Sequence, residues 1–140
     1  VHALPGLSGR KPAASVEHVA FGIGCEIMTQ FGLLIDNEYC TGCHSCEVAC
    51  KNEHSIPLGR WGIKLLEMGP WKLGDGKSWE YRFVPVPTKE CDLCADRMAK
   101  GAAKPACAHH CLADAIEYGP VDELAKKMCE KGKMCSIFLP

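Results

Sequence analysis

The chain has 140 residues, a formal charge of −1 and 24% charged residues. This length suits one compact domain with room for an extra arm or insertion. The near-neutral charge argues against broad binding to nucleic acid or to an anionic membrane surface. No apolar run approaches the roughly 20 residues that span a bilayer, and residues 1–27 lack the charged and apolar segments of a signal peptide.

Eleven cysteines are far too many to be incidental, and disulfides, zinc sites and iron–sulfur clusters compete to explain them. A disulfide scaffold usually belongs to a secreted chain. Nothing in the sequence indicates export, and the cysteine count is odd. We therefore expect metal-bound thiolates in a reducing, cytoplasmic setting, with export alongside a partner left open.

The segment before the first cysteine motif predicts an arm followed by a strand. Residues 1–31 are rich in Gly, Ala and Pro without clear periodicity, so we expect an irregular N-terminal arm. Met28 begins a segment that would suit a native start, so residues 1–27 could be an extension absent from the native protein. The apolar run from Gly32 to Asn37 predicts a short buried strand.

Residues 55–88, between the two cysteine motifs, predict an inserted hairpin or loop lobe. Ile63 to Met68 and Trp79 to Val84 are its expected strands, and the glycines and proline between them signal the turns. The insertion also holds three tryptophans, Trp61, Trp71 and Trp79. They could form a small second core or a docking face for a larger subunit, since Trp is favoured at interface anchors.

The C-terminal part predicts a strand, a helix and an apolar tail. Ala115 to Tyr118 reads as a closing strand, and a helix is expected from Val121 to Lys131, between Pro120 and Gly132. Its apolar face is Val121, Leu124, Ala125 and Met128. We therefore expect an arm over 1–31, a main domain over 32–119 and a C-terminal helix and tail over 120–140.

The first cysteine motif has the form C-x2-C-x2-C-x3-C, with Cys40, Cys43, Cys46 and Cys50. A cubane cluster has four iron corners, and each needs one thiolate. A loop with cysteines at every third residue can curl around one face and reach three corners, but not the fourth. We expect the next cysteine to begin a helix and to point toward a second cluster.

The second half supplies the complementary thiols, because Cys91 and Cys94 are followed, after a longer loop, by another C-x3-C pair. By symmetry, one [4Fe–4S] cluster is expected on Cys40, Cys43, Cys46 and Cys111. The other is expected on Cys91, Cys94, Cys107 and Cys50. The leftover cysteines, Cys25, Cys129 and Cys135, read as free thiols rather than as a third site.

Zinc is the chief alternative, because separated C-x2-C pairs can build four-cysteine zinc sites. A four-cysteine zinc site does not, however, require three cysteines separated by two residues each and a fourth cysteine after three more residues. Three histidines near the motifs, His44, His109 and His110, are either groups that tune the clusters or ordinary loop residues. Lys51 either places a cation between the clusters, favouring their reduced state, or is a solvated surface lysine.

The cysteine motifs resemble those of bacterial-type two-cluster ferredoxins. More closely, the chain resembles the four-cluster iron–sulfur subunits of the dimethyl sulfoxide reductase family of molybdenum and tungsten enzymes. The resemblance covers about residues 32–125, and its matching stretches are Tyr39 to Lys51, Cys91 to Cys94, Lys104 to Cys107 and Cys111 to Gly119. It implies an α+β, ferredoxin-like fold with duplicated cluster-binding halves, an inserted hairpin lobe and a C-terminal helix.

The resemblance also implies a non-catalytic subunit that relays single electrons to or from a large molybdenum- or tungsten-pterin subunit. The chain departs from that family in having cysteines for only two clusters, and from simple ferredoxins in having Lys51 and Leu112 where they place Pro. A free-standing ferredoxin serving several enzymes is the alternative. An enzyme with an open iron site would need a cubane held by three cysteines, whereas eight are available here for two.

Overall fold

The computed structural model describes residues 30–140, which form an α+β fold with two separate sheets. The elements among these residues are β1 (Phe31–Asp36), α1 (Ser45–His54), β2 (Ile63–Lys72), β3 (Trp79–Pro87), α2 (Ala95–Ala99), α3 (Ala106–His109), β4 (Ile116–Pro120), α4 (Val121–Lys131) and β5 (Cys135–Phe138). Within this range, no helix is both long and apolar enough to cross a membrane.

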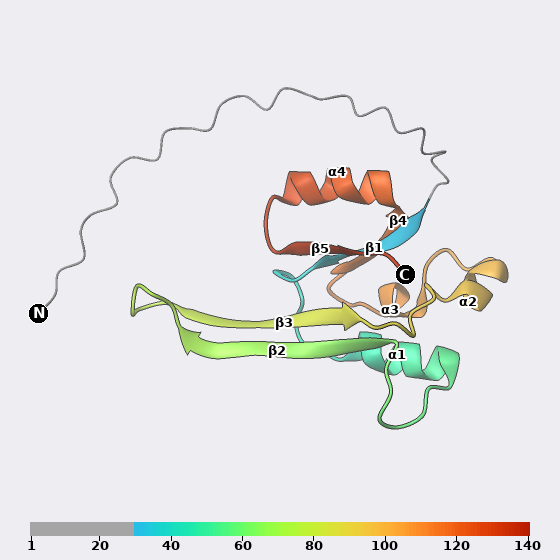
Figure 1. The fold of residues 1–140 in the computed structure, drawn as a ribbon, viewed down its shortest axis with the longest axis horizontal. Helices are drawn as coiled ribbons and strands as arrows, with labels where there is room; N and C mark the ends of the chain where they lie inside the picture. Colours follow the sequence, from blue (N-terminus) through green and yellow to red (C-terminus); the bar gives the residue numbers. More distant parts are fainter. Residues whose placement is uncertain (1–29) are drawn as a thin grey trace, which may run out of the picture.

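The central sheet is antiparallel, with β1 between β4 and β5. Leu33, Leu34 and Ile35 of β1 are each only 1% exposed, so both faces of this strand are covered. Leu33 and Ile35 point to the core that contains the cysteines. Leu34 points to the other face, on the side of the strand where α4 packs with its buried Leu124 (Figure 1).

The second sheet is the hairpin of β2 and β3, which extends well beyond the body of the molecule (Figure 1). At its base, Ile63 and Leu65 are buried against the cysteine-containing part. Toward its tip, the large side chains of Trp71, Trp79 and Tyr81 are exposed. The hairpin predicted over 63–84 is therefore confirmed, and it is longer than expected at both strands.

Several other sequence predictions can be compared with these elements. The helix expected from Val121 to Lys131 is present with the same bounds, and Gly132 caps it by donating its N–H to the carbonyl of Met128. The tail was not expected to form a strand, but β5 pairs with β1. The N-terminal arm over 1–31, apart from its last two residues, lies outside the described residues, as do Cys25 and Met28.

The prediction that Cys50 begins a helix is wrong. The helix α1 begins at Ser45, before Cys46, and Cys50 lies in its second half. The reason is that His44 adopts a left-handed conformation, with φ of 59°, which turns the chain into the helix directly after Cys43.

Asp36 joins the end of β1 to the end of α4. Its carboxylate accepts a hydrogen bond from Lys131 Nζ at 2.9 Å and one from the N–H of Glu38 at 3.1 Å. Burial alone raises the pKa of Asp36, but these hydrogen bonds and the charge of Lys131 outweigh it, so that the pKa lies below its ordinary value of 3.8. The carboxylate therefore stabilises the folded state, and this contribution is lost as the pH falls through the lowered pKa.

We expect Asp36→Asn to lower the free energy of unfolding at pH 7 by about 1–3 kcal/mol, because a buried hydrogen-bonded anion is lost. The difference from the wild type should shrink as the pH falls through the folded-state pKa of Asp36, where the wild-type carboxylate is protonated as well. Denaturant unfolding at several pH values measures this. Glu130→Gln, on the exposed side of the same helix, is the control, and a difference that does not depend on pH would contradict the assignment.

Candidate metal centre

The first cysteine loop turns tightly before α1. Gly42 has φ of +74°, and a Cβ at this position would lie 2.5 Å from the ring of Phe83. Only glycine therefore satisfies both the backbone conformation and the packing against β3. The loop in turn places Cys40, Cys43 and Cys46 beside one cavity that the hairpin also borders.

The structure places Cys111, from the second cysteine motif, beside these three cysteines. All four border one enclosed and mainly apolar cavity, whose walls also include Leu65, Pro85 and Ile116. We call Cys40, Cys43, Cys46 and Cys111 the first thiol set. Cys43 is exposed, Cys40 and Cys111 are partly exposed, and Cys46 is buried.

The other four cysteines of the motifs lie together in a more buried place. Burial raises the pKa of the Cys107 thiol, and the neighbouring charges of Cys94, Cys91 and Cys50 raise it further. We call Cys50, Cys91, Cys94 and Cys107 the second thiol set. Three of its members are buried, and Cys91 is partly exposed.

The exchange of cysteines between the two halves follows from the helices. Cys46 and Cys50 both lie on α1, one turn apart, which separates them by about 6 Å along the helix axis. Cys46 therefore faces the first set, while Cys50 reaches the second. In the other half, Cys107 lies on α3 and Cys111 follows the end of that short helix. This pair is divided in the same way, with Cys107 in the second set and Cys111 in the first.

Burial and mutual repulsion hold most of these thiols in the protonated form in the absence of a metal. Burial raises the pKa of Cys46 to about 12, with further contributions from Cys40 and Cys111. Burial likewise raises the pKa of Cys50 to about 11, with contributions from Cys94 and Cys91. Metal binding would have to displace these protons, so it would be coupled to proton release.

Backbone N–H groups point at the sulfurs in both sets. The N–H of Gly42 donates to Cys40, and those of Gly62 and Ile63 donate to Cys50. Gly62 also passes so close to Cys50 that a Cβ would lie 2.6 Å from Sγ. Sequence reasoning missed Gly62, because nothing near position 62 marks a contact with a cysteine twelve residues earlier.

A histidine that the sequence did not single out contacts the second set. His54 Nε2 lies 3.2 Å from Cys94 Sγ and 3.7 Å from the carboxylate of Asp92. Its position at the end of α1 brings it near Cys94, forty residues later in the chain. Only the length and direction of α1 could have indicated this contact.

The residues that the sequence did single out lie in other surroundings. His44 Nδ1 is 3.1 Å from Glu47 Oε2, and the residue borders the cavity of the first set. His109 and His110 meet edge to face at the surface. Lys51 Nζ donates to the carbonyls of Pro57 and Arg60, so its ammonium is held by a loop rather than by the thiols.

The donor sets suit iron–sulfur clusters in number and kind, with four thiols around each of two places. In residues 30–140, no three His, Cys, Asp or Glu side chains converge as a single metal ion would require. A four-iron cluster does not need such convergence, because each thiolate bonds to a different iron at a corner of the cubane. The four thiols of the first set border one apolar space, which is the arrangement of donors that such a group needs.

Comparison with known proteins finds relatives among the iron–sulfur components of reductases. The chain is 30% identical over 160 aligned positions to the B component of the anaerobic dimethyl sulfoxide reductase of Escherichia coli, covering 71% of this chain and 78% of that protein. It is 24% identical to the B component of the polysulfide reductase of Wolinella succinogenes, covering 71% of this chain and 81% of that one.

A third relative, from Halobacterium salinarum, is named provisionally as an iron–sulfur subunit of dimethyl sulfoxide reductase. It is 33% identical over 75 residues, which make up 46% of this chain. The chain spans only 29% of that relative's length. No family model matches the chain.

Proposed function

This protein belongs to the iron–sulfur subunits of the dimethyl sulfoxide reductase family, and on this premise we propose that it holds two [4Fe–4S] clusters, one on each thiol set. When bound, each cluster takes up and releases one electron. The observation that carries the proposal is the gathering of eight thiols into two sets of four, with Cys50 and Cys111 exchanged between the motifs.

The protein's own residues bind the clusters and set their surroundings. The thiolates supply the ligands, and the N–H groups of residues such as Gly42 and Gly62 donate to the sulfurs. The apolar side chains of Leu33, Ile35 and Ile116 pack in the same core and limit the access of water. Hydrogen bonds to sulfur and burial are the factors by which a protein sets the potential of such a group.

The proposal includes a ferredoxin-like origin by duplication. Each half has a cysteine pair or triplet and a C-x3-C pair that begins on a helix, α1 in the first half and α3 in the second. The two halves would then form one domain over 32–119, which contains the insertion 55–88. A C-terminal helix and tail over 120–140 follow this domain. A reducing, cytoplasmic setting is part of the proposal, because the eight thiols have to stay unoxidised until iron binds.

We assign the chemistry to a partner, a large catalytic subunit with a molybdenum– or tungsten–pterin centre, and give this chain a non-catalytic role. Two relatives are named as the B component of a reductase, which supports a complex of several subunits. The hairpin supports a protein partner, because Trp71, Trp79 and Tyr81 are exposed along it. Aromatic side chains are enriched at interface anchors, and a two-stranded ribbon alone is only marginally stable.

Anaerobic purification of the complex, with iron, sulfide and partner analysis, tests the proposal. We expect about eight irons and eight sulfides per chain, as two cubanes require, together with a stoichiometric large subunit that contains the pterin. A colourless protein with bound zinc would overturn the cluster assignment. Full iron content without any large subunit would instead support a free-standing ferredoxin.

We expect Trp79→Ala to weaken binding to the catalytic subunit about tenfold or more, because truncating a tryptophan that anchors an interface costs about 2 kcal/mol or more and about 1.4 kcal/mol is tenfold. The iron content should stay unchanged, since Trp79 is the first residue of β3, whereas Pro85 near the other end of this strand borders the first thiol set. Titration of the labelled chain with its partner measures the affinity. Lys77→Ala, at the tip of the same hairpin, is the control, and wild-type affinity of Trp79→Ala would exclude the hairpin from the interface.

A further inference from the structure

His54, the last residue of α1, lies beside the second thiol set. One helical turn separates it from Cys50, so the two side chains leave the same face of α1. His54 Nε2 lies 3.2 Å from the sulfur of Cys94, and the side chain of His54 is only 27% exposed. A histidine that follows the first cysteine motif therefore contacts a proposed cluster ligand of the second motif.

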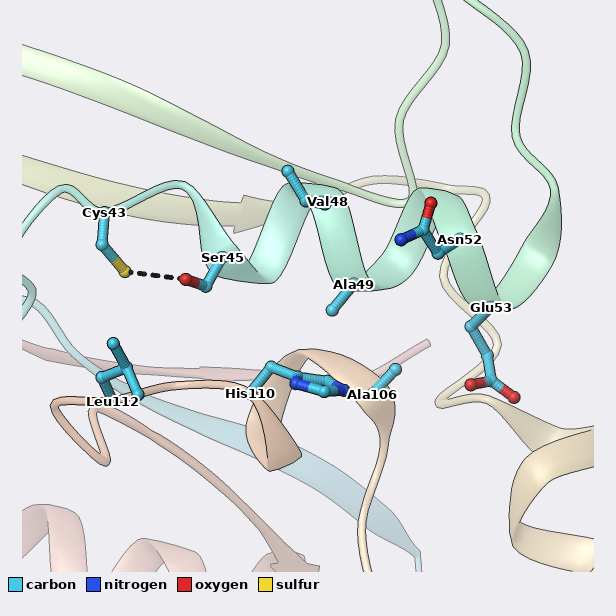
Figure 2. Close-up of a pocket in the computed structure, with 9 residues that line it drawn as sticks. All are labelled: Cys43, Ser45, Val48, Ala49, Asn52, Glu53, Ala106, His110 and Leu112. Carbon is cyan, nitrogen blue, oxygen red and sulfur yellow. Dashed lines mark hydrogen bonds between the residues drawn. The ribbon is translucent and has the colours of Figure 1, made fainter.

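The end of α1 is held in place relative to the second motif. Glu53 extends from α1 toward α2, as Figure 2 shows, and its carboxylate accepts a hydrogen bond from Arg97 Nη1 at 3.0 Å. Arg97 also donates through its Nε to the carbonyl of Lys104 at 3.1 Å. These bonds join the last turn of α1 to the segment that follows Cys94, so the position of His54 beside that cysteine is well defined.

Asp92 fixes the other side of the contact. Its Oδ1 accepts a hydrogen bond from the backbone N–H of Cys94 at 2.8 Å, where Cys94 adopts a left-handed conformation with φ of 56°. The same carboxylate oxygen lies 3.7 Å from His54 Nε2. This ring nitrogen thus faces two groups, the sulfur of Cys94 and the carboxylate of Asp92.

Both of these groups accept hydrogen bonds. A carboxylate has no hydrogen to donate, and neither has a thiolate sulfur bonded to iron. The imidazole hydrogen is therefore assigned to Nε2, and the nearer acceptor is Cys94 Sγ. Hydrogen bonds to the sulfurs are one of the factors that set the potential of an iron–sulfur cluster, because they stabilise the negative charge that reduction adds.

Three charged side chains also lie near Cys94, namely Asp92, Glu53 and Arg97. Glu53 and Arg97 form an ion pair at 3.0 Å, so their charges largely cancel. The carboxylate of Asp92 remains, and its negative charge opposes the addition of an electron nearby. A hydrogen-bond donor at the sulfur acts against that effect.

We propose that the Nε2–H of His54 donates a hydrogen bond to Cys94 Sγ and thereby raises the reduction potential of the cluster on the second thiol set. His54 is a positioning residue in this role, since it acts through the sulfur and is not itself a ligand. The inference rests on the proposed function, and it concerns a different histidine from the three that the sequence singled out.

Redox titration of the anaerobically loaded full chain, followed by electron paramagnetic resonance, tests this role. The second cluster is the centre that Cys50→Ser removes. In His54→Phe, which keeps a ring without a donor, this centre should become about tenfold harder to reduce, about 59 mV for one electron. His54→Gln keeps an uncharged N–H donor and should restore most of the potential. Asn52→Ala, an exposed change on α1 (Figure 2), is the control and should shift neither centre.

A measurement on the wild-type side chain does not depend on how the variants load. When the histidines carry a heavy nitrogen isotope, the reduced second cluster should show a hyperfine coupling to that nitrogen, and the coupling should be absent from His54→Gln. An unchanged potential in His54→Phe, a shift confined to the other centre, or no nitrogen coupling in the wild type would overturn the proposal. A preparation that holds zinc and no iron would instead contradict the proposed function itself.

Discussion

Replacing Cys50 by Ser should remove about half of the iron, leaving about four irons per chain, and the cluster lost should be that of the second thiol set. The reason is that Cys50 belongs to the first motif in sequence but lies with Cys91, Cys94 and Cys107 in space. Cys50 is buried on α1, so water from bulk solvent has little access to the position of the lost ligand. Iron and sulfide analysis after anaerobic loading measures the loss.

Double variants show which cluster is lost. Cys50→Ser combined with Cys91→Ser should keep about four irons, because both changes act on one cluster. Cys50→Ser combined with Cys40→Ser should keep almost none. If the two results were reversed, the exchange of cysteines between the motifs would be wrong. Cys129→Ser, outside both sets and exposed on α4, should leave the iron content unchanged.

The sequence could predict the thiol sets because the relevant signals are local and strong. Cysteines at fixed short spacings leave few ways to surround a cluster, so the two C-x3-C pairs already implied an exchange between the halves. The helix α4 was predictable for a similar reason. Pro120 precedes it, Gly132 ends it, and Leu124 lies on its apolar face, all within one short segment.

Features that depend on distant parts of the chain could not be predicted. The strand β5 has only four residues, and its pairing with β1 spans about a hundred positions. Leu93 has φ of 58° at the position where the first loop has Gly42, so the two cysteine loops share a conformation that their sequences do not share. Leucine gives no local sign of this left-handed turn; the surrounding packing imposes it.

The contacts around the sulfurs could not be predicted from the sequence either. Ser45 and His54 both approach thiols because of where α1 begins and ends, and the sequence alone misplaced the start of that helix. The carbonyl of Gly62 accepts a hydrogen bond from Thr88, which ties the two strands of the hairpin together at its base. The position of Gly62 beside Cys50 thus follows from the packing of the hairpin on α1.

Gly62→Ala should abolish the second cluster and leave the first. The added Cβ would lie 2.6 Å from Cys50 Sγ, closer than real Cβ contacts allow, with Ile56 Cδ1 at 3.5 Å on another side. The backbone of Gly62 cannot move away easily, because Thr88 holds its carbonyl at 2.9 Å. The helix α1 fixes the backbone of Cys50, so the contact is relieved only by a rotation that turns its sulfur away from the present position. We therefore expect iron analysis to find about four irons per chain.

Gly74→Ala is the matched control, because a Cβ at this position near the hairpin tip would meet no atom within 4 Å. It should keep about eight irons, the content of two cubanes. A loss of iron in both variants would point to a general effect on the hairpin rather than to the contact with Cys50. Full iron content in Gly62→Ala would mean that Cys50 does not need its present position, and the second thiol set would then have to obtain its fourth ligand elsewhere.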